Sequence, residues 1–478
     1  MCGISGIYNH GNIQKAKDAL AQMNDAMKHR GPDDDGIYAD ELVGLGHRRL
    51  SIIDLSAAGH QPMRSADGNI EIVYNGEIYN YREVREILGK DSFRTATDTE
   101  VIIRAWQKWG TSCLEHLNGM FAFAIWDKRS GELFIARDRL GIKPLYYYRE
   151  NNLLVFASEI RTLLNSGMVP ARIDHDALTD YFTYQTVHAP DTIIRGIKML
   201  MPGHYLIAKR NEVRTECYWD LIAQANKKGD HGSYDEVCGK IRELFSQAVR
   251  KRLVSDVPFG AFLSGGIDSS AVVGYMSRFL ENPVNTFHIS FDESEFSEAK
   301  YARMVAEKFH TNHHEFRLTP ADFLQKLPDA VQALDHPSGD GPNSWLVSKI
   351  TRENGVTMAL SGLGGDELFA GYPVFTRIPQ IRSLKWLWLM SVSMRVSIVD
   401  MLSKGKPEAQ RMKLRELVSL DKNSIGESLP LFRRITGRDH VSSLISQPLA
   451  NDNLKQIMDS GYRNGLDDLP ALSQISYG

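Results

Sequence analysis

A glycine- and serine-rich turn between an apolar run and a helical pattern constrains the fold of this chain most. The apolar run covers residues 257–263, and the turn reads Ser264-Gly265-Gly266-Ile267-Asp268-Ser269-Ser270. A helical pattern follows over 271–280, and a second apolar run covers 284–291. Two strands joined through a helix run parallel, because the crossover returns the chain to the same end of the sheet. The segment therefore predicts an α/β domain with a parallel sheet.

The same turn is suited to hold an anion. Glycines let the backbone approach a ligand, and successive N–H groups at a helix N-terminus attract negative charge. A second strand-like run, 356–360, also ends in a glycine-rich segment, 361–372. Ligands of open α/β sheets bind beyond the carboxyl ends of the strands. With 56 basic and 59 acidic residues the net charge is −3, so no broad basic field predicts nucleic-acid binding, and an anion must be held locally.

The first 205 residues follow a different pattern, of short alternating or apolar runs separated by turn residues. Residues 127–131 read as a hairpin turn, and Thr97-Asp98-Thr99-Glu100 is a capping box that opens a helix. This half should therefore be mixed, with packed sheets and a few helices. The expected strands are 70–74, 120–126, 133–136 and 153–157.

A polar, glycine-rich stretch at 225–232 indicates a domain boundary. Ser233 then caps a predicted helix whose apolar residues recur at helical spacing. These residues are Val237, Ile241, Leu244, Phe245, Ala248 and Val249.

The chain has the features of a cytoplasmic protein. Its four cysteines, Cys2, Cys113, Cys217 and Cys238, are scattered and form no CxxC pair, which favours neither a disulfide framework nor a zinc site. The N-terminus carries no basic and apolar signal segment. The most apolar later stretch, 386–394, is too short to span a bilayer and is expected to be a buried or packing helix.

Cys2 is the first candidate for chemistry. Removal of Met1 would make it the N-terminal residue, with a thiol and an α-amino group on one residue. The amine can then take the thiol proton so that the thiolate attacks a carbonyl. A lone cysteine can equally be an inert buried thiol, so Cys2 alone leaves both interpretations open.

Further segments resemble the glutaminase domain of class II glutamine amidotransferases. They are Met1-Cys2-Gly3-Ile4, His29-Arg30-Gly31-Pro32-Asp33, residues 46–54, Tyr74-Asn75-Gly76-Glu77 and the 137–146 motif RDRLGIKPLY. The resemblance implies that Cys2 is the nucleophile and that Asn75 and Gly76 donate to the oxyanion. It implies a glutamine site of Arg49, Leu50, Ser51, Ile52, Ile53, Asn75, Gly76, Glu77 and Asp98, in which Arg49 binds the α-carboxylate and Glu77 and Asp98 accept from the α-ammonium and the amide. Singly, Asn75-Gly76 could be a hairpin turn, Asp98 a helix-capping residue and Arg49 a surface charge.

The SGGxDSS spacing of residues 264–270, between a strand and a helix, resembles the PP-loop of ATP pyrophosphatases, and residues 360–372 resemble a second signature of the same domain. The 264–270 loop is not a Walker motif, because no GK[ST] follows it. The resemblance implies ATP as substrate and a Mg²⁺ ion held by Asp268 and Asp366. The ATP-binding residues implied are Leu263, Ser264, Gly265, Gly266, Asp268, Ser269, Ser270, Ile289, Ser361 and Gly362.

Together these motifs resemble the glutamine-dependent asparagine synthetase family. The resemblance implies an α-β-β-α N-terminal-nucleophile sandwich over residues 2–210 and an α/β parallel-sheet synthetase domain over 233–478. Glutamine would yield glutamate and ammonia, and ATP would adenylate an acceptor carboxylate, by default aspartate, giving AMP and pyrophosphate. No nucleic-acid partner or membrane span is expected, and a homodimer is one option for the assembly.

Three departures keep other functions open. The family usually carries Glu where this chain has Leu363, and residues 335–343 are closer to proteins thought to amidate sugar uronic acids in surface-polysaccharide pathways. The chain also ends at Gly478, short of the usual family length, so the synthetase domain is expected to be truncated. A glutaminase or binding paralogue without synthetase activity is therefore a further alternative. Amidotransfer to a sugar phosphate shares Cys2 but does not account for the 264–270 loop.

Overall fold

The computed structural model describes residues 1–89, 93–227, 232–292, 297–445 and 452–477. The chain divides into two compact units. The first unit combines 1–174, 189–220 and 231–361, and the second combines 175–188, 221–230 and 362–478. The boundary expected at 225–232 falls partly on residues 228–231, which lie outside the described residues, and it stays a prediction.

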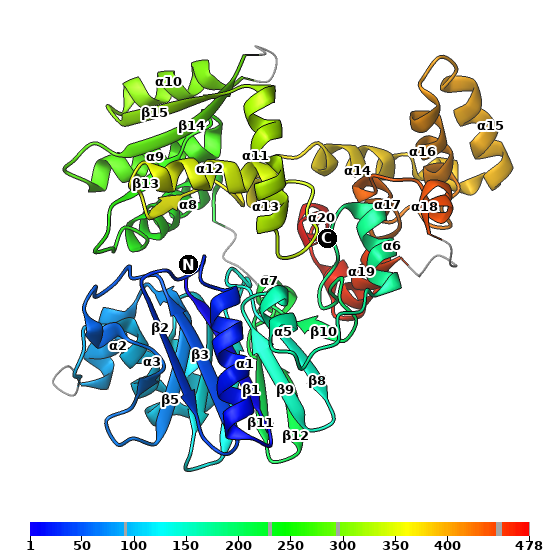
Figure 1. Ribbon diagram of the computed structural model, residues 1–478. Helices are drawn as coiled ribbons and strands as arrows, with labels where there is room; N and C mark the ends of the chain where they lie inside the picture. Colours follow the sequence, from blue (N-terminus) through cyan, green and yellow to red (C-terminus); the bar gives the residue numbers. More distant parts are fainter. Residues whose placement is uncertain (90–92, 228–231, 293–296, 446–451, 478) are drawn as a thin grey trace. The chain divides into compact units, whose positions relative to one another are not determined.

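The N-terminal part of the first unit is built on two antiparallel sheets of six strands each (Figure 1). Both sheets pair only antiparallel neighbours. In spatial order, the first contains β10 (Ile197–Met199), β8 (Tyr146–Glu150), β9 (Leu153–Ala157), β1 (Gly3–Tyr8), β3 (Val43–Arg49) and β2 (Asp34–Ala39). The second contains β12 (Glu212–Cys217), β11 (His204–Lys209), β7 (Glu132–Arg137), β6 (Gly119–Asp127), β5 (Ile70–Ile78) and β4 (Met63–Arg64).

Three apolar cores stack through this part and define its layers. The middle core joins Ile4 and Leu45 of the first sheet to Val73 and Ile135 of the second. The outer face of the first sheet packs on α1 (Ile13–Ala26) and α5 (Ile160–Asn165), and that of the second on α2 (Tyr81–Leu88), α3 (Asp98–Trp109) and α4 (Cys113–His116). Two short 3₁₀ helices, η1 (Ala57–Gly59) and η3 (Gly110–Ser112), lie in the connections. The predicted α-β-β-α sandwich is confirmed.

The local patterns of this half are confirmed as well. The four expected strands lie within β5, β6, β7 and β9, and the 127–131 turn joins β6 to β7 as a hairpin. Thr97 caps α3 by accepting from the Glu100 N–H at 3.3 Å. The Glu100 carboxylate instead accepts from the N–H groups of Arg94 and Thr95, so only half of the expected capping box forms.

The rest of the first unit is built on a parallel sheet of four strands with the order β15-β14-β13-β16. The chain runs outward from β13 to β15 and then crosses to the other side of β13. The loop after β13 therefore lies where the strand order reverses, the usual ligand position in such sheets. The strands are β13 (Phe259–Phe262), β14 (Asn285–Phe291), β15 (Asn312–Leu318) and β16 (Met358–Leu360), and the helices are α8 (Tyr234–Lys251), α9 (Ile267–Phe279), α10 (Ala299–Lys308), α11 (Pro320–Ala333) and α12 (Gly341–Glu353). This confirms the predicted α/β sheet.

Helix α8 begins as predicted, but its apolar stripe is only partly covered. Ser233 and Glu236 form a complete capping box. Val249, near the end of the helix, is 4% exposed and belongs to the core beneath β13, whereas Leu244 is 57% exposed. Helical spacing predicts a helix and its apolar face, but not how much of that face another element will cover.

The second unit is helical and has its own core, formed by Ile222, Phe375, Ile378, Ile425, Leu429, Met458, Leu466 and Ile475. Its helices are α6 (His175–Tyr184), α7 (Leu221–Ala225), α13 (Gly365–Phe369), α14 (Val374–Ser383), α15 (Val392–Leu402), α16 (Glu408–Val418), α17 (Ile425–Arg433), α18 (Arg438–Leu444), α19 (Asn453–Arg463) and α20 (Ala471–Tyr477), with 3₁₀ turns η4 (Lys385–Leu389) and η5 (Leu466–Asp468).

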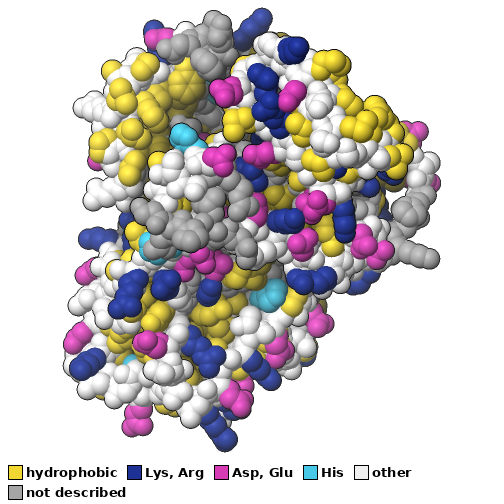
Figure 2. All heavy atoms as spheres, turned by 90° about the vertical axis from the view of Figure 1, so that its right-hand side faces the viewer, with side chains coloured by type: hydrophobic (Ala, Val, Ile, Leu, Met, Phe, Trp, Pro, Cys, Tyr) yellow, Lys and Arg dark blue, Asp and Glu magenta, His cyan; other side chains and the backbone are white. Residues whose placement is uncertain are grey.

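The buried or packing helix expected over 386–394 does not form as one helix. This stretch forms the 3₁₀ turn η4 and then the start of α15, and Leu389 is 90% exposed. A short apolar run carries no period from which its burial can be judged. Other hydrophobic side chains are also visible at the surface in the view of Figure 2.

Two further expectations agree with the structure. All four cysteines are free thiols. Within the described ranges, no helix is both long and apolar enough to cross a membrane.

We expect Phe134→Ala to lower the free energy of unfolding of the sandwich by about 3–5 kcal/mol, because it opens a cavity in a packed aromatic cluster. Phe134 is fully buried and stacks on Trp106 at a centroid distance of 4.6 Å. Urea unfolding followed by tryptophan fluorescence measures the change. Phe291→Ala, at a site 40% exposed, is the matched control and should cost less than about 1 kcal/mol. Equal losses in the two variants would contradict this account of the core.

Candidate active site

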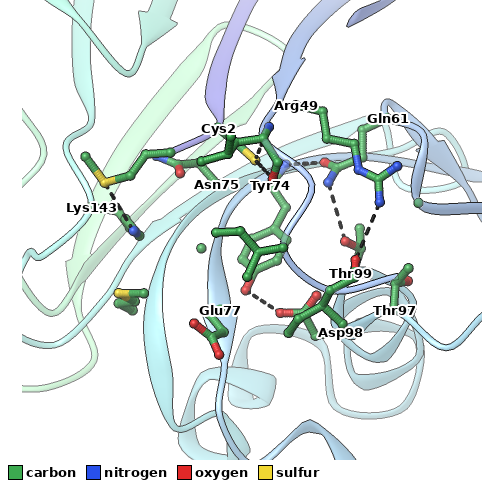
Figure 3. A pocket seen from close by; sticks show the side chains of 17 residues that line it. Cys2, Arg49, Gln61, Tyr74, Asn75, Glu77, Thr97, Asp98, Thr99 and Lys143 are labelled. Atoms are coloured by element: carbon green, nitrogen blue, oxygen red, sulfur yellow. Dashed lines mark hydrogen bonds between the residues drawn. The ribbon is translucent and has the colours of Figure 1, made fainter. Parts of the chain in front are cut away.

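One pocket in the sandwich collects the predicted glutaminase residues (Figure 3). Of that set, only Ser51 lies elsewhere: it lines a neighbouring pocket, and its N–H donates to Asp33 Oδ2 at 2.8 Å. The residues come from four places: directly before β1, the end of β3 with the loop that follows it, the carboxyl half of β5, and the start of α3. The pocket is lined by Met1, Cys2, Arg49, Leu50, Ile52, Ile53, Gly59, Gln61, Tyr74, Asn75, Gly76, Glu77, Thr97, Asp98, Thr99, Met120 and Lys143.

Cys2 is held by backbone on two sides. Its Sγ lies 3.4 Å from the Leu50 nitrogen and 3.6 Å from the Leu50 carbonyl oxygen, and its own carbonyl accepts from Arg30 Nε at 3.0 Å. Strand β1 begins at the next residue and is buried along its whole length. The thiol is thus fixed at the pocket wall by a strand in the middle of the sheet.

Asn75 and Gly76 lie inside strand β5, not in a turn. They pair with Ala122 and Phe121 of β6, which excludes a hairpin turn at this dipeptide. Asn75 is 1% exposed, and neither its Nδ2 nor its Oδ1 has a hydrogen-bond partner. A Cβ on Gly76 would lie 2.3 Å from the Met120 carbonyl oxygen, so only glycine fits there. A buried, unpartnered amide is costly and suggests that a ligand completes its bonds.

Arg49 is buried beside the pocket, which excludes the alternative interpretation of this residue as a surface charge. Its guanidinium donates to the carbonyl oxygens of Ser56 at 2.9 Å and of Asp54 and Ile53, which fixes the loop after β3. A Cβ on Gly59 would lie 1.9 Å from Arg49 Nη2, so this loop closes on the guanidinium only with glycine there.

Two buried carboxylates form the opposite wall. Asp98 Oδ2 accepts from Tyr74 Oη at 2.8 Å and from the Ile78 N–H at 3.0 Å. Glu77 is 4% exposed, and its Oε1 has no partner. Burial, with the nearby Asp98 charge adding to it, raises the pKa of Glu77 to about 8. Burial also raises the pKa of Asp98. Ionising both of these buried carboxyl groups at once is costly. A cation bound beside them would reduce that cost, so the pair is suited to bind a cation.

Lys143 is a lining residue that the sequence reasoning did not single out. It is 5% exposed, burial lowers its pKa to about 8, and its Nζ donates to Met1 Sδ at 3.3 Å. Asp138 holds the Lys143 loop by accepting four backbone N–H groups, from Phe121, Leu140, Ile142 and Lys143. The 137–146 motif was the available signal. Gln61 and Met120 also line the pocket, as do Tyr74, Thr97 and Thr99, which lie in motifs quoted from the sequence but were given no role in the site there.

The loop after β13 has the shape expected of an anion cradle. Gly265 has φ +86°, and a Cβ there would lie 2.5 Å from Tyr301 Cβ, so the turn requires glycine. Ser264 Oγ and Ser269 Oγ are 3.1 Å apart. Gly266 caps α9, whose first turn carries Asp268. The other predicted ATP residues of this unit are Leu263 at the carboxyl end of β13, Ser270 in α9, Ile289 in β14 and Ser361 directly after β16.

The predicted magnesium ligands lie in different compact units. Asp268 belongs to the first unit, whereas Asp366, in α13, belongs to the second together with Gly362. The described residues contain no cluster of three or more ligands that would form a complete metal cage. Carboxylates are nonetheless donors of the type Mg²⁺ prefers, and this ion usually completes its shell with waters and substrate phosphates.

A cysteine at position 2, directly before a buried strand and in one pocket with an unpartnered asparagine amide, is the arrangement of a class II glutamine amidotransferase domain, and the α-β-β-α sandwich is the fold of that class. Sequence comparison agrees, because residues 1–219 match the glutamine amidotransferase domain family. Residues 240–463 match the asparagine synthase family. The chain belongs to the glutamine-hydrolysing asparagine synthase family, whose members are ATP-dependent ligases.

Relatives with different names match over most of this chain. It is 35% identical to a candidate asparagine synthetase, named glutamine-hydrolysing, of Methanocaldococcus jannaschii, over 90% of this chain and 94% of that protein. It is 32% identical to asparagine synthetase 3 of Bacillus subtilis, over 92% of this chain and 73% of that protein. It is also 33% identical to the amidase chry2 of Gibberella zeae, over 78% of this chain and 60% of that protein.

We expect Glu77→Gln to stabilise the free protein at pH 8 but not at pH 5. The pKa of Glu77 rises from 4.5 to about 8 on folding, so the wild-type chain loses stability as pH rises through that window. A neutral glutamine removes this loss, a gain of up to about 4 kcal/mol at pH 8. Urea unfolding at the two pH values measures it, with the exposed Glu83→Gln as control. An equal gain at both pH values would show that ionisation is not the cause.

Proposed function

We propose that this chain hydrolyses glutamine at Cys2 and uses the ammonia to amidate an ATP-activated carboxylic acid. The observation that carries the first half is the unpartnered Asn75 amide in the pocket that Cys2 lines. Residues 2–210 would carry out glutamine hydrolysis, and residues 233–478 would activate the acceptor.

Hydrolysis would begin after removal of Met1, whose side chain lines the pocket in this structure. The freed Cys2 amine takes the thiol proton, and the thiolate attacks the side-chain amide carbon of glutamine. The Asn75 Nδ2 and Gly76 N–H groups donate to the oxyanion of the tetrahedral intermediate. The amine returns the proton to the leaving nitrogen, ammonia departs, and water then hydrolyses the thioester to glutamate.

The pocket walls match a glutamine zwitterion. Glu77, with Asp98 behind it, faces the α-ammonium, and ammonium binding would favour the ionised carboxylate. Arg49 supplies positive charge for the α-carboxylate, and Leu50, Ile52 and Ile53 bound the aliphatic part of the substrate. The buried Lys143 side chain, freed of its contact with Met1, would place a cationic group at the wall of the pocket that Cys2 lines.

Acceptor activation would take place at the glycine-rich loops. The acceptor carboxylate attacks the α-phosphorus of ATP and releases pyrophosphate; ammonia then attacks the acyl-adenylate carbonyl and AMP leaves. The 264–270 loop and the N-terminus of α9 hold phosphate oxygens, and Leu263 and Ile289 border the adenosine together with Ser361 and Gly362. Asp268 and Asp366 would hold Mg²⁺, which supplies charge neutralisation on the phosphates.

Aspartate is the first acceptor to test, because relatives of this chain are named asparagine synthetases. A sugar uronic acid is the alternative. It is favoured by Leu363, an apolar side chain where the family usually has a carboxylate, and by the segment 335–343. The relative named an amidase is a further reason to test other acids.

We expect Asn75→Ala to lower kcat for glutamate release by about 10²–10³-fold while KM for glutamine changes little, because the amide acts on the oxyanion and not on the substrate's charged groups. Steady-state glutamate formation measures both constants. Asn118→Ala, which alters an exposed asparagine outside the pocket, is the control and should match the wild type. A variant within threefold of wild-type kcat would remove Asn75 from the oxyanion site.

We expect Cys2→Ala to abolish glutamate release and glutamine-dependent AMP formation but to retain AMP formation with ammonium chloride. Mg-ATP is supplied with aspartate and, separately, with several uronic acids, and AMP, pyrophosphate and amide product are measured. AMP with aspartate alone would identify an asparagine synthetase, and AMP with a uronate alone would reassign the acceptor. Glutamate release without AMP for any acid would contradict the second half of the proposal.

A further inference from the structure

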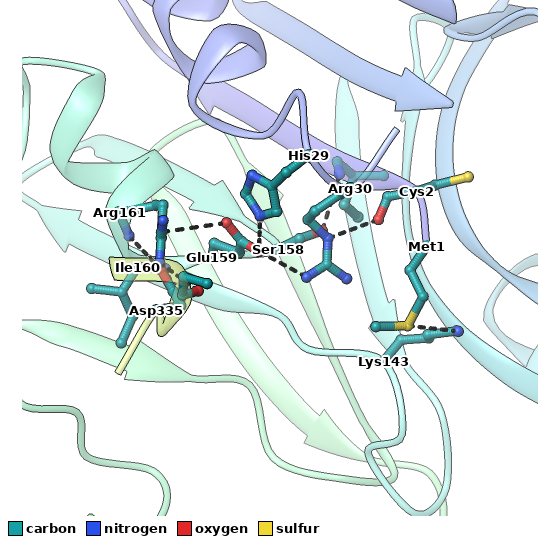
Figure 4. Close-up of polar contacts among 12 residues, drawn as sticks. Met1, Cys2, His29, Arg30, Lys143, Ser158, Glu159, Ile160, Arg161 and Asp335 are labelled. Carbon is teal, nitrogen blue, oxygen red and sulfur yellow. Dashed lines mark hydrogen bonds and ion pairs between the residues drawn. The ribbon is translucent and has the colours of Figure 1, made fainter. Parts of the chain in front are cut away.

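Two carboxylates, those of Glu159 and Asp335, lie at the start of α5, the helix that follows β9. Arg161 Nε lies 3.7 Å from Glu159 Oε2 and 3.3 Å from Asp335 Oδ1, but the other partners of the two carboxylates differ. Glu159 is the N-cap residue of α5, yet its side chain makes no capping hydrogen bond. The cap comes instead from Asp335, far along the chain but in the same compact unit. Asp335 Oδ2 accepts from the Ile160 N–H at 2.6 Å, and Oδ1 accepts from the Arg161 N–H at 2.9 Å (Figure 4).

The capping is reciprocal. The Arg161 side chain pairs with Asp335 at 3.3 Å and also donates to the carbonyl oxygens of Gln332 and Ala333, at the carboxyl end of α11. A carboxylate at a helix N-terminus and a guanidinium at a helix C-terminus both interact favourably with the helix dipole. The segment after α11 is therefore fixed to the start of α5 by charge and hydrogen bonds together.

Because Asp335 supplies the cap, Glu159 is turned toward the nucleophile. Its Oε1 accepts from Arg30 Nη1 and pairs with His29 Nε2, each at 2.9 Å. Arg30 in turn donates through Nε to the carbonyl of Cys2 at 3.0 Å (Figure 4). The side chains of Arg30 and Glu159 are only 9% and 8% exposed, so solvent screens this pair little.

We propose that Asp335 is a positioning residue for Cys2: by capping α5 it leaves Glu159 free to hold Arg30 on the carbonyl of the nucleophile. This rests on the proposed function of Cys2. Without Asp335, the first N–H groups of α5 lose their acceptor and Glu159 is the nearest carboxylate to replace it. Glu159 would then turn from Arg30 to its own helix, and Cys2 would lose a fixed contact.

The test is Asp335→Asn in the full chain after Met1 removal, because asparagine keeps the volume but offers one acceptor oxygen and no charge. We expect kcat for glutamate release to fall about tenfold with KM for glutamine within twofold. Arg49, Glu77 and Asp98 make no contact with Asp335 among the hydrogen bonds of the described residues, so substrate binding should be spared. Asp322→Asn is the control, since Asp322 also takes part in a helix cap, the capping box of α11, but its partner there is Thr319.

A double-variant cycle separates this path from a general loss of stability. In a Glu159→Gln background, Asp335→Asn should add less than a twofold further loss, because the contact through which it acts is already weakened. A full tenfold loss in that background, or an Asp335→Asn enzyme within twofold of the wild-type kcat, would overturn the proposal.

Hydrogen exchange gives a readout that does not depend on glutamine turnover. In Asp335→Asn, faster exchange is expected both in residues 160–165 and in residues 28–31, around Arg30. Faster exchange in 160–165 alone would mean that the cap is purely local and would overturn the proposal. If the wild-type chain released no glutamate, the proposed function would fail, while this exchange pattern would still decide whether Asp335 acts through Glu159 on Arg30.

Discussion

The site depends on the burial of the chain's first strand in the middle of a sheet. β1 pairs with β3 on one side and β9 on the other, and each of its residues is buried. Ile4 contributes to the core between the sheets and Ile7 to the core beneath α1. A chain terminus normally frays, because few contacts oppose its conformational entropy. Here both cores hold β1 in place, and the position of Cys2, the residue directly before β1, is therefore fixed as well.

The pocket retains polar groups that a purely structural core would not. The Asn75 amide and one Glu77 oxygen are buried without partners, and each such group costs stability. The apolar cores on both faces of the sheets offset this cost, as is common where a site is shaped for a ligand and not for the free protein. Glycine is required at position 76 for a separate, steric reason: the neighbouring strand leaves no room for a side chain.

The sequence was most informative where a local motif carries its own chemistry. The strand-loop-helix unit at 257–280 predicted a parallel sheet, and the short motifs around Cys2, Arg49 and Asn75 predicted residues that the fold brings to one pocket. It was less informative where the outcome depends on distant partners. Lys143 reaches the pocket of Cys2 from a loop that Asp138 folds back, and Asp335 reaches α5 from 175 positions along the chain. The 137–146 motif marks the Lys143 loop but not the pocket that it reaches, and no periodic pattern connects Asp335 to α5.

The placement of charge in the pocket bears on which amides it can use. With no ligand, Glu77 keeps its proton up to about pH 8, because burial and Asp98 both oppose its ionisation. An α-ammonium group would offset this cost by pairing with the carboxylate, whereas a simple amide would leave Glu77 neutral and its oxygen unpartnered. A site that depends on such a pairing rejects analogues lacking the group far more strongly than an apolar pocket rejects a missing methylene. Selection for glutamine would thus arise at Glu77 and Asp98, and not at the Cys2 thiol that reacts.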